Sequence, residues 1–212
     1  MTRVEAVISD FGGVLTSPLI DSFAALLDSS GIPAQALGPA LAAIVARDHT
    51  NPLFELETGR MSEREFLHTL ETQLSGQLAR EIRLDGFGAR YFEHLQPNEP
   101  LIDYMRALRS RGYKLAICTN NVREWEPLWR AKLPVQEIFD VVVDSAFVGA
   151  RKPEPRIYQI TLERLGVPPH AALLVDDVEV NCNAARDLGI GAVWFRTTEQ
   201  TIEELEMALS TT

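Results

Sequence analysis

The sequence predicts an α/β fold in which a doubly wound parallel sheet is interrupted by a long helical insertion. Five short apolar runs lack the strict alternation of half-buried strands, which is typical of strands buried on both faces of a parallel sheet. From about residue 100 onward these runs alternate with helical patterns, as in a doubly wound sheet. Residues 17–95 contain helical patterns and no convincing strand. This segment is therefore interpreted as an insertion after the first strand.

In the core, apolar runs of four to eight residues are assigned as strands, and the amphipathic segments between the later ones are assigned as helices. The predicted strands are Val4–Ser9, Tyr113–Cys118, Asp140–Val143, Ala171–Val175 and Gly191–Phe195. The predicted helices are Val122–Ala131, Arg156–Leu165, Asn181–Leu188 and Thr201–Leu209. We expect a core domain formed by residues 1–16 and 96–212.

The insertion, residues 17–95, is predicted to be a separate helical domain. Its helical patterns cover Ile20–Ser29, Pro39–Arg47, Ser62–Leu74 and Ala79–His94. Turn signals with glycine and proline separate these helices near Gly31 and Asn51. Ser62 followed by Glu65 has the spacing of a capping box, which predicts a helix that begins just after Ser62.

Charge and composition exclude several classes of partner. The chain has 20 Lys and Arg against 30 Asp and Glu, for a net charge of −10. Nucleic acids and anionic membrane surfaces reward clustered basic residues, so we expect neither as a partner. No apolar run reaches the roughly 20 residues of a membrane helix, and no signal peptide is recognisable, so a cytoplasmic location is expected. Cys118 and Cys182 match no metal or redox spacing and are expected to be small buried apolar residues.

Polar residues follow the predicted strands at the points where ligands bind in an open parallel sheet. Each has an ordinary explanation by itself: Asp10 as a turn former, Asp177 as a helix N-cap, Lys152 as a solvated loop residue. Adjacent acids at the end of a buried strand are harder to explain, because like charges repel there unless a cation or donors compensate. The strand-end residues are Asp10 with Phe11–Gly13, Thr119 with Asn120, Lys152 beyond the third strand, and Asp176 with Asp177.

These residue types together indicate phosphoryl-transfer chemistry. A carboxylate beside flexible glycine backbone, as at Asp10, can attack an electrophile and form a covalent intermediate. Asp176 and Asp177 offer the hard oxygen ligands that Mg²⁺ prefers. Lys152 and Thr119 can hold the transferring group and offset its charge, while backbone N–H groups around Phe11–Gly13 can form an anion-binding nest.

Four segments of the chain resemble the haloacid dehalogenase (HAD) superfamily of hydrolases, in family order and spacing. They are Val7–Thr16, Ile117–Asn120, Arg151–Tyr158 and Leu174–Asp177 with Asn181 after it. The resemblance covers essentially the whole chain and implies a Rossmann-like core with the insertion as a helical cap. Within the superfamily the sequence is most similar to the group that holds the N-terminal phosphatase domain of soluble epoxide hydrolase and small sugar-phosphate phosphatases.

The resemblance also implies a role for each site residue. Asp10 would be the nucleophile that becomes a phospho-aspartate, and Thr119 and Lys152 would bind the phosphoryl group. Phe11, Gly12, Gly13, Asn120 and Asn181 would be further substrate contacts. Asp10, Asp176, Asp177 and the backbone carbonyl of Gly12 would hold Mg²⁺. The implied partner is a small phosphorylated metabolite, bound by a monomer or a homodimer.

One departure from the family pattern leaves three functions open. Phosphatases of the family usually carry a second Asp two residues after the nucleophile, as general acid and base, and here Gly12 occupies that position. General acid-base help is worth about 10²- to 10⁴-fold in rate. The first hypothesis is a Mg²⁺-dependent phosphatase whose substrate has a good leaving group, or one that uses an acid from the cap. The second is a metal-independent 2-haloacid dehalogenase, against which the Asp176–Asp177 pair counts. The third is a weakly catalytic or non-catalytic regulatory protein that binds a phosphorylated ligand.

Other residues of the insertion and core allow more limited expectations. Asn51–Arg60 is either a segment that overhangs the site or a loop and helix packed on its neighbours. His49 and His68 are expected on the surface. Trp125 and Trp129 are four apart and are expected to share a helix face and pack in the core, with a dimer contact or the rim of the site as the alternatives.

Overall fold

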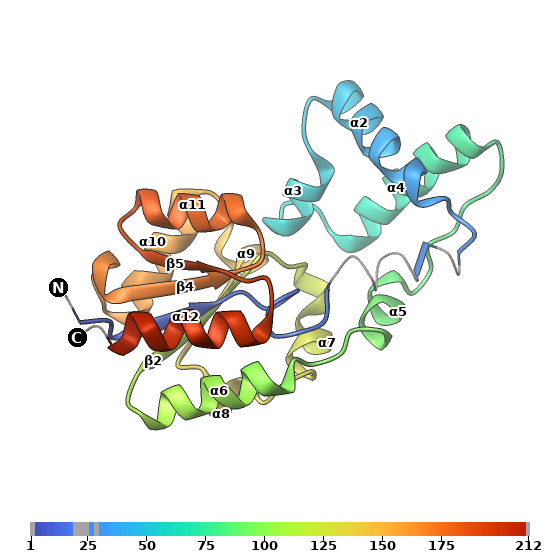
Figure 1. Ribbon diagram of the computed structural model, residues 1–212. Helices are drawn as coiled ribbons and strands as arrows, with labels where there is room; N and C mark the ends of the chain where they lie inside the picture. Colours follow the sequence, from blue (N-terminus) through green and yellow to red (C-terminus); the bar gives the residue numbers. More distant parts are fainter. Residues whose placement is uncertain (1–2, 19–25, 28–29, 211–212) are drawn as a thin grey trace.

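The computed structural model describes residues 3–18, 26–27 and 30–210, which form a sheet-containing lobe and a helical lobe (Figure 1). The sheet has five strands in the order β3-β2-β1-β4-β5, and every neighbouring pair is parallel. The predicted α/β fold with a doubly wound parallel sheet is confirmed. The strands are β1 (Ala6–Ser9), β2 (Lys114–Thr119), β3 (Val141–Asp144), β4 (Ala172–Asp176) and β5 (Gly191–Trp194).

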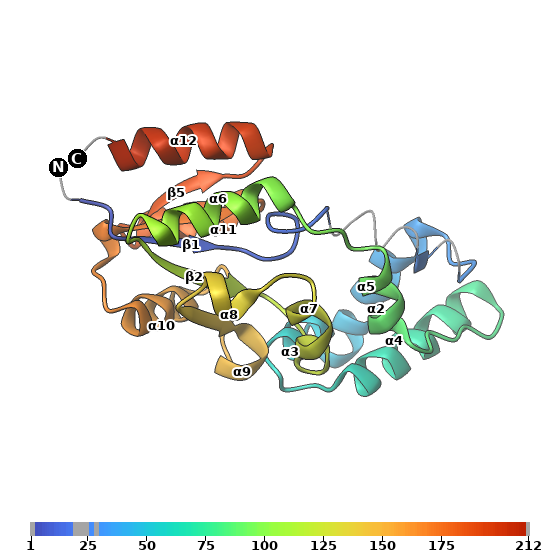
Figure 2. The same ribbon diagram turned by 90° about the horizontal axis from the view of Figure 1, so that it is seen from below.

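Helices cover both faces of the sheet (Figures 1 and 2). One face carries α6, α8 and α12, and the other carries α10 and α11. Two separate apolar clusters lie under these layers, because successive residues of each strand point to opposite faces: Val7 belongs to one cluster and Ile8 to the other. The helices of this lobe are α6 (Glu99–Ser110), α7 (Glu126–Arg130), α8 (Val135–Ile138), α9 (Ser145–Val148), α10 (Pro155–Leu165), α11 (Glu179–Asp187) and α12 (Thr198–Ser210), with 3-10 turns η2 (Arg123–Trp125) and η3 (Pro169–Ala171).

Two helical predictions for this lobe need correction. Helix α6 was not among the predicted helices, although Leu101, Ile102, Met105 and Leu108 form its buried face at helical spacing. The predicted helix Val122–Ala131 is divided into η2 and α7. Pro127 stands in the first turn of α7, where a missing N–H costs nothing, so a new helix begins there.

The helical lobe contains η1 (Ala34–Ala36), α2 (Leu37–Asp48), α3 (Pro52–Glu57), α4 (Glu63–Leu78) and α5 (Phe87–Glu93). The capping box of α4 is confirmed: the Glu65 N–H donates to Ser62 Oγ over 3.3 Å, and the Ser62 N–H donates to Glu65 Oε2 over 2.9 Å. The predicted helix Ile20–Ser29 lies mostly outside the described residues.

The single helix predicted over Ala79–His94 is wrong. Ala79 adopts a left-handed conformation, with φ of 51°, and ends α4. Gly86, with φ of 64°, precedes α5. Residues 80–86 form no helix. Two left-handed residues thus break a segment whose composition favours a helix.

The chain passes between the lobes on two adjacent segments. Thr16 and Pro97 form an isolated antiparallel bridge, and the Ser17 N–H donates to the Gln96 carbonyl over 2.7 Å. The Asn98 side chain ties this crossing to the core by donating to the Val14 carbonyl over 2.9 Å. The domain boundaries at residues 16/17 and 95/96 stay a prediction.

Two smaller expectations concern helix length and cysteine placement. Among the described residues, no helix has both the length and the apolar character that crossing a bilayer demands. Cys118 and Cys182 are buried, as expected, and both are free thiols.

Candidate functional site

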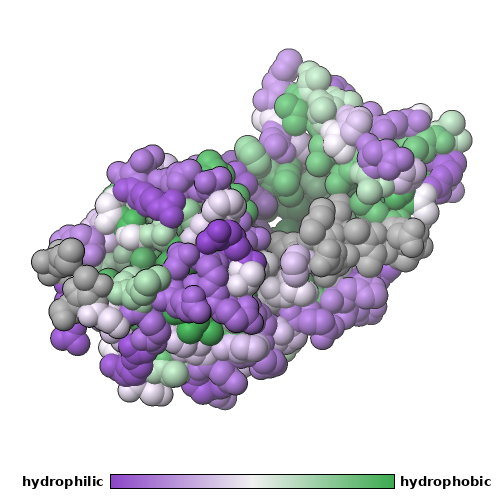
Figure 3. All heavy atoms as spheres, viewed as in Figure 1, coloured by the Kyte–Doolittle hydropathy of each residue, from purple (hydrophilic) through white to green (hydrophobic). Residues whose placement is uncertain are grey.

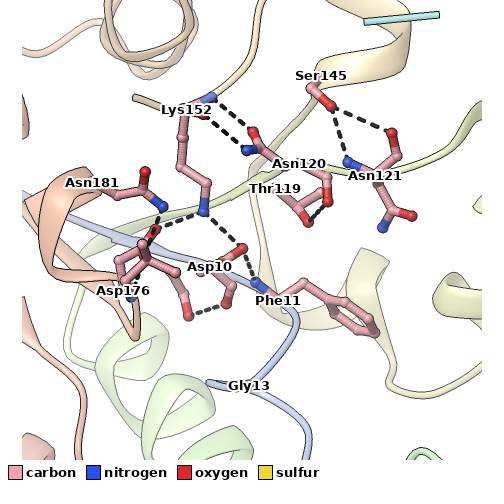
Figure 4. Close-up of polar contacts among 12 residues, drawn as sticks. Asp10, Phe11, Gly13, Thr119, Asn120, Asn121, Ser145, Lys152, Asp176 and Asn181 are labelled. Carbon is pink, nitrogen blue, oxygen red and sulfur yellow. Dashed lines mark hydrogen bonds and ion pairs between the residues drawn. The ribbon is translucent and has the colours of Figure 1, made fainter. Parts of the chain in front are cut away.

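The carboxyl ends of the central strands bring the predicted site residues together (Figure 4). Asp10 follows β1 directly, and its N–H donates to the Val175 carbonyl of β4 over 2.8 Å. Thr119 is the last residue of β2, and Asp176 is the last of β4. Neighbouring parallel strands in register therefore end side by side, which places three strand-end side chains at one edge of the sheet.

Lys152 lies between two of the carboxylates. Its Nζ is 2.8 Å from Asp10 Oδ1 and 2.6 Å from Asp176 Oδ2. The Lys152 side chain is 1% exposed. An unpaired buried ammonium would cost several kcal/mol, so these two ion pairs are what make its position tenable. The alternative that Lys152 is a solvated loop residue is excluded.

Burial and charge shift the pKa values of this group. Burial raises the pKa of Asp10 to about 7; the charge of Lys152 opposes that shift, whereas Asp176 and Asp177 add to it. Burial by itself would lower the pKa of Lys152, but the charges of Asp10 and Asp176 raise it well above its usual range. Lys152 is therefore a permanent positive charge in the site.

Asp177 completes a cluster of three carboxylates. Ligand oxygens of Asp10, Asp176 and Asp177 all lie within 4.8 Å of one another. Helix α11 begins at Glu179 without a side-chain cap, so Asp177 is not the N-cap that its position allowed. Gly13 leaves the room that the Asp177 carboxylate fills, because a Cβ on Gly13 would stand 2.3 Å from Asp177 Oδ2. Three hard oxygen donors so close together fit the ligand preference of Mg²⁺.

Asn120 and Asn181 hold other site residues. The Asn120 amide pairs with the backbone of Lys152, accepting from its N–H over 2.7 Å and donating to its carbonyl over 3.0 Å. Asn181 Nδ2 donates to Asp176 Oδ1 over 2.9 Å. Both residues also line the cavity described below. Direct contact between either amide and a substrate stays a prediction.

Two backbone N–H groups of the loop after β1 donate hydrogen bonds to side chains of the same loop. The Phe11 N–H donates to Asp10 Oδ1 over 2.7 Å, and the Gly13 N–H donates to Thr16 Oγ1 over 3.2 Å. These two groups hold the loop and the nucleophile candidate. Asp10 Oδ1 thus receives two donors, whereas Asp10 Oδ2 has no donor among the described residues.

A cavity of about 590 Å³ opens between the lobes above the carboxylates. Figure 3 shows the hollow, with apolar side chains gathered on its walls. The polar groups lie at the sheet end: Asp10, Gly12, Thr119, Asn120, Lys152, Asp177 and Asn181. The wall of the helical lobe is apolar except for Glu57; its other residues are Leu37, Leu41, Leu53, Phe54, Leu56, Phe66, Leu70, Phe87, Tyr91, Phe92 and Leu95.

Trp125 belongs to the rim of this cavity, and Trp129 belongs to the core. Trp125 lies against Phe87 and Tyr91 of the helical lobe at ring-centroid distances of 6.1 and 5.3 Å. Trp129 is fully buried against Phe11 at 5.2 Å. Core packing is confirmed for Trp129, whereas Trp125 is half-buried at the rim, which was the alternative. The expected shared helix face is wrong, because η2 carries Trp125 and α7 carries Trp129. His49 and His68 are exposed, as expected.

The cavity also contains an ion pair between the lobes that the sequence analysis did not single out. Arg151 Nε lies 2.6 Å from Glu57 Oε2, and the two side chains are only 14% and 16% exposed. The Arg151 guanidinium lies over the Phe54 ring at 3.9 Å. Two features of the sequence could have indicated this pair. Glu57 falls within Asn51–Arg60, the segment considered as an overhang, and Arg151 directly precedes the site residue Lys152. Both interpretations of Asn51–Arg60 hold in part: Leu53, Phe54, Leu56 and Glu57 line the cavity, and α3 also packs on α2, α4 and α9.

Comparison with known proteins agrees with this geometry. A family model for haloacid dehalogenase-like hydrolases matches residues 4–189. The chain is 31% identical over 121 residues to the bifunctional epoxide hydrolase 2 of Rattus norvegicus, covering 54% of this chain and 21% of that protein. It is 36% identical over 92 residues to a glyceraldehyde 3-phosphate phosphatase of Pyrococcus abyssi, covering 42% of this chain and 38% of that one. The chain spans about a fifth of the length of the first curated relatives that it matches.

Solved structures share the fold at low sequence identity. A HAD family enzyme from Bacteroides thetaiotaomicron, solved as a magnesium complex, has a TM-score of 0.65 at 19% identity, covering 93% of this chain and 96% of that one. The L-2-haloacid dehalogenase RSc1362 has a TM-score of 0.69 at 20% identity, covering 99% and 100%. At this level of identity the two structures show the shared fold alone, and the chemistry has to be argued from the site.

Proposed function

The chain belongs to the haloacid dehalogenase-like hydrolases, and from that premise we propose that it is a Mg²⁺-dependent phosphatase of a small phosphate monoester, acting through a phospho-aspartate on Asp10. The observation that carries the proposal is the cluster of three carboxylates around a buried lysine. A dehalogenase needs the aspartate nucleophile but no metal, so it would have no use for Asp177 beside Asp176.

In the proposed mechanism, Asp10 and Lys152 act directly on the phosphoryl group. Asp10 Oδ2, which has no donor among the described residues, attacks phosphorus, and the bond from phosphorus to the ester oxygen breaks. Lys152 and Thr119 compensate the negative charge of the transferring group. Water then attacks the phospho-aspartate, which releases inorganic phosphate and restores Asp10.

Asp10, Asp176, Asp177 and the Gly12 carbonyl would hold Mg²⁺. Bound there, the ion would supply positive charge that favours the ionised form of Asp10 and offsets the charge of the phosphate. Asn181 and Asn120 have positioning roles in this proposal, since they orient Asp176 and Lys152.

The apolar wall of the cavity favours a substrate whose organic group is apolar. A sugar hydroxyl placed against Leu41, Phe66 or Leu70 would lose its hydrogen bonds to water without replacement. Each such group costs about 1–3 kcal/mol, which corresponds to about 5- to 150-fold in affinity. We therefore expect aryl or alkyl phosphates to be better substrates than sugar phosphates.

The test is a substrate panel with purified protein. Nitrophenyl, alkyl and sugar phosphates are assayed for phosphate release with Mg²⁺ and with a chelator, and a 2-haloacid is assayed for halide release. We expect Mg²⁺-dependent release from the apolar esters, and loss of that release in Asp10→Asn. Halide release without metal would replace the phosphatase proposal with a dehalogenase, and phosphate-ester binding without turnover would indicate a phospholigand-binding protein.

A further inference from the structure

The position that usually carries the general acid and base is Gly12, which has no side chain to exchange a proton. A proton donor for the leaving group therefore has to come from elsewhere in the cavity lining. Among the described residues, its carboxyl side chains are Asp10, Asp177 and Glu57, and it contains no histidine. Asp10 and Asp177 belong to the carboxylate cluster. The remaining carboxyl group is that of Glu57.

Glu57 is held over the site by the helical lobe. Asn51 caps the start of α3 by accepting from the Leu53 N–H over 3.0 Å, and Leu56, which is 2% exposed, anchors the end of the helix. Arg151 then fixes one oxygen of the Glu57 carboxyl, Oε2, at 2.6 Å. The other oxygen, Oε1, has no hydrogen-bond partner among the described residues. In an in-line displacement the leaving oxygen lies opposite the attacking oxygen of Asp10. Asp10 and Glu57 line the same cavity, so Glu57 is a candidate to reach that oxygen.

We infer that Glu57 is the general acid and base of the proposed phosphatase, so this inference rests on the proposed function. In the first step Asp10 forms a bond to phosphorus, the bond from phosphorus to the ester oxygen breaks, and that oxygen takes the proton of Glu57. In the second step the Glu57 carboxylate takes a proton from water. The water oxygen forms a bond to phosphorus, and the bond from phosphorus to Asp10 breaks. Glu57 and Asp10 end in their initial states.

The surroundings of Glu57 support this role. Burial raises its pKa above the ordinary value, although the charges of Arg151 and Lys152 lower it in part. A phosphate dianion in the cavity would raise it further, because like charges disfavour ionisation. Tyr91 also lines the cavity, but burial raises the pKa of its hydroxyl above the usual range, which makes it a weaker proton donor.

In the part of the chain that the structure describes, three helices pack against α3, and two of them carry charged or titratable side chains. Helices α2 and α4 pack on it, as does α9, whose four residues carry no titratable group. Besides Glu57, the charged or titratable residues of α2, α3 and α4 are Arg47, Asp48, Glu55, Glu63, Arg64, Glu65, His68 and Glu71. The two charges that act on the pKa of Glu57 come instead from the loop that holds Arg151 and Lys152.

The experiment compares leaving groups in Glu57→Gln. Glutamine keeps the size of the side chain and an oxygen for Arg151, but its amide is neither an acid nor a base that can exchange a proton with the leaving oxygen or with water. An alkyl phosphate has a poor leaving group and needs the acid. The leaving group of a nitrophenyl phosphate is a stable nitrophenolate, which departs without a proton. We expect kcat for the alkyl phosphate to fall by about 10²- to 10⁴-fold. Nitrophenyl phosphate should show a burst of about one phenolate per active site, followed by slow turnover, because water attack still lacks its base.

Glu55→Gln is the matched control, since Glu55 is on the same helix, pairs with Arg60 and does not line the cavity. Its kinetics should equal those of the wild type. Glu57→Asp keeps a carboxyl group and should turn over the alkyl phosphate faster than Glu57→Gln but more slowly than the wild type. If Glu57→Gln does not fold, Glu57→Asp is compared with the wild type on both substrates instead. Equal losses on both substrates without a burst would overturn the inference while leaving the phosphatase proposal intact. A wild type inactive on both phosphates would overturn the phosphatase proposal, and the inference with it.

Discussion

Gly13→Ala tests whether the carboxylate cluster is the working part of the site. Gly13 has a φ of 77°, and a Cβ there would stand 2.3 Å from Asp177 Oδ2 and 3.0 Å from Asp177 Cγ. An ordinary contact begins at 3.4 Å, so the Asp177 carboxylate has to move by about 1 Å. We expect the Asp177 side chain to rotate, which displaces its oxygens relative to those of Asp10 and Asp176.

Two separate costs follow from this substitution. The left-handed backbone of an alanine costs about 1–2 kcal/mol in folding free energy, which lowers the melting temperature of a chain of this size by about 2–8 °C. The displaced carboxylate adds a functional cost, since a displacement of 1 Å at a reacting centre is worth about 10²-fold in rate. We expect Mg²⁺-dependent turnover to fall by about that factor, with a higher Mg²⁺ concentration needed for half-maximal activity.

Gly112→Ala is the matched control for the backbone cost. Gly112 has a φ of 92°, and a Cβ there would meet nothing within 4 Å. It lies in the turn between α6 and β2, at the end of β2 remote from Thr119. Both variants should lose similar stability in a thermal unfolding experiment, but only Gly13→Ala should lose turnover. If the two variants retained the same Mg²⁺-dependent rate, the position of Asp177 would not matter and the cluster argument would be refuted.

Two further predictions concern stability. Burial raises the pKa of Asp144 from 3.8 to about 6, so the folded state binds this proton more tightly than the unfolded state, and stability is lost as pH rises through that window. Asp144→Asn keeps an acceptor for the Ala146 N–H and should be more stable than the wild type at pH 7, by up to about 3 kcal/mol. In urea unfolding the difference should shrink below about pH 4, and an advantage that persisted there would contradict the assignment. Ser62→Ala removes the acceptor for the Glu65 N–H and should cost about 1 kcal/mol of unfolding free energy, with the wild-type rate retained. A change below a few tenths of a kcal/mol would show that the capping box contributes little.

The sheet and the residues at its edge could be predicted because both depend on local sequence. A buried strand such as Leu173–Val175 needs an unbroken apolar run, and the polar residue that ends the run marks the strand end. Asp10 and Asp176 were found in this way, and adjacent strands then bring them together. The same local signal failed over Ala79–His94, because the break there depends on backbone conformations at Ala79 and Gly86 that composition does not specify.

Partners distant in sequence could not be predicted. Glu57 and Arg151 are 94 positions apart, and their ion pair exists because the helical lobe is folded over the sheet edge. The pairing of Asn120 with the Lys152 backbone has the same origin, since it joins the loop after β2 to the loop after α9. Residue type and spacing identify which groups are able to bind a ligand or take part in a reaction. Tertiary packing decides which of these groups lie in contact.

The acidic character of the chain is consistent with an anionic substrate once the site is considered by itself. Three of its acids, Asp10, Asp176 and Asp177, face a single buried cation, Lys152. Without a further cation the site is net negative and would repel a phosphate dianion. A divalent ion in the cluster would balance the remaining charge, so the affinity for phosphate should depend on the metal. An ionised Glu57 neutralises Arg151, its partner at 2.6 Å, whereas a protonated Glu57 leaves the charge of Arg151 to attract the phosphate. The charge that a phosphate brings is thus the same charge that keeps the proposed acid in its donating form.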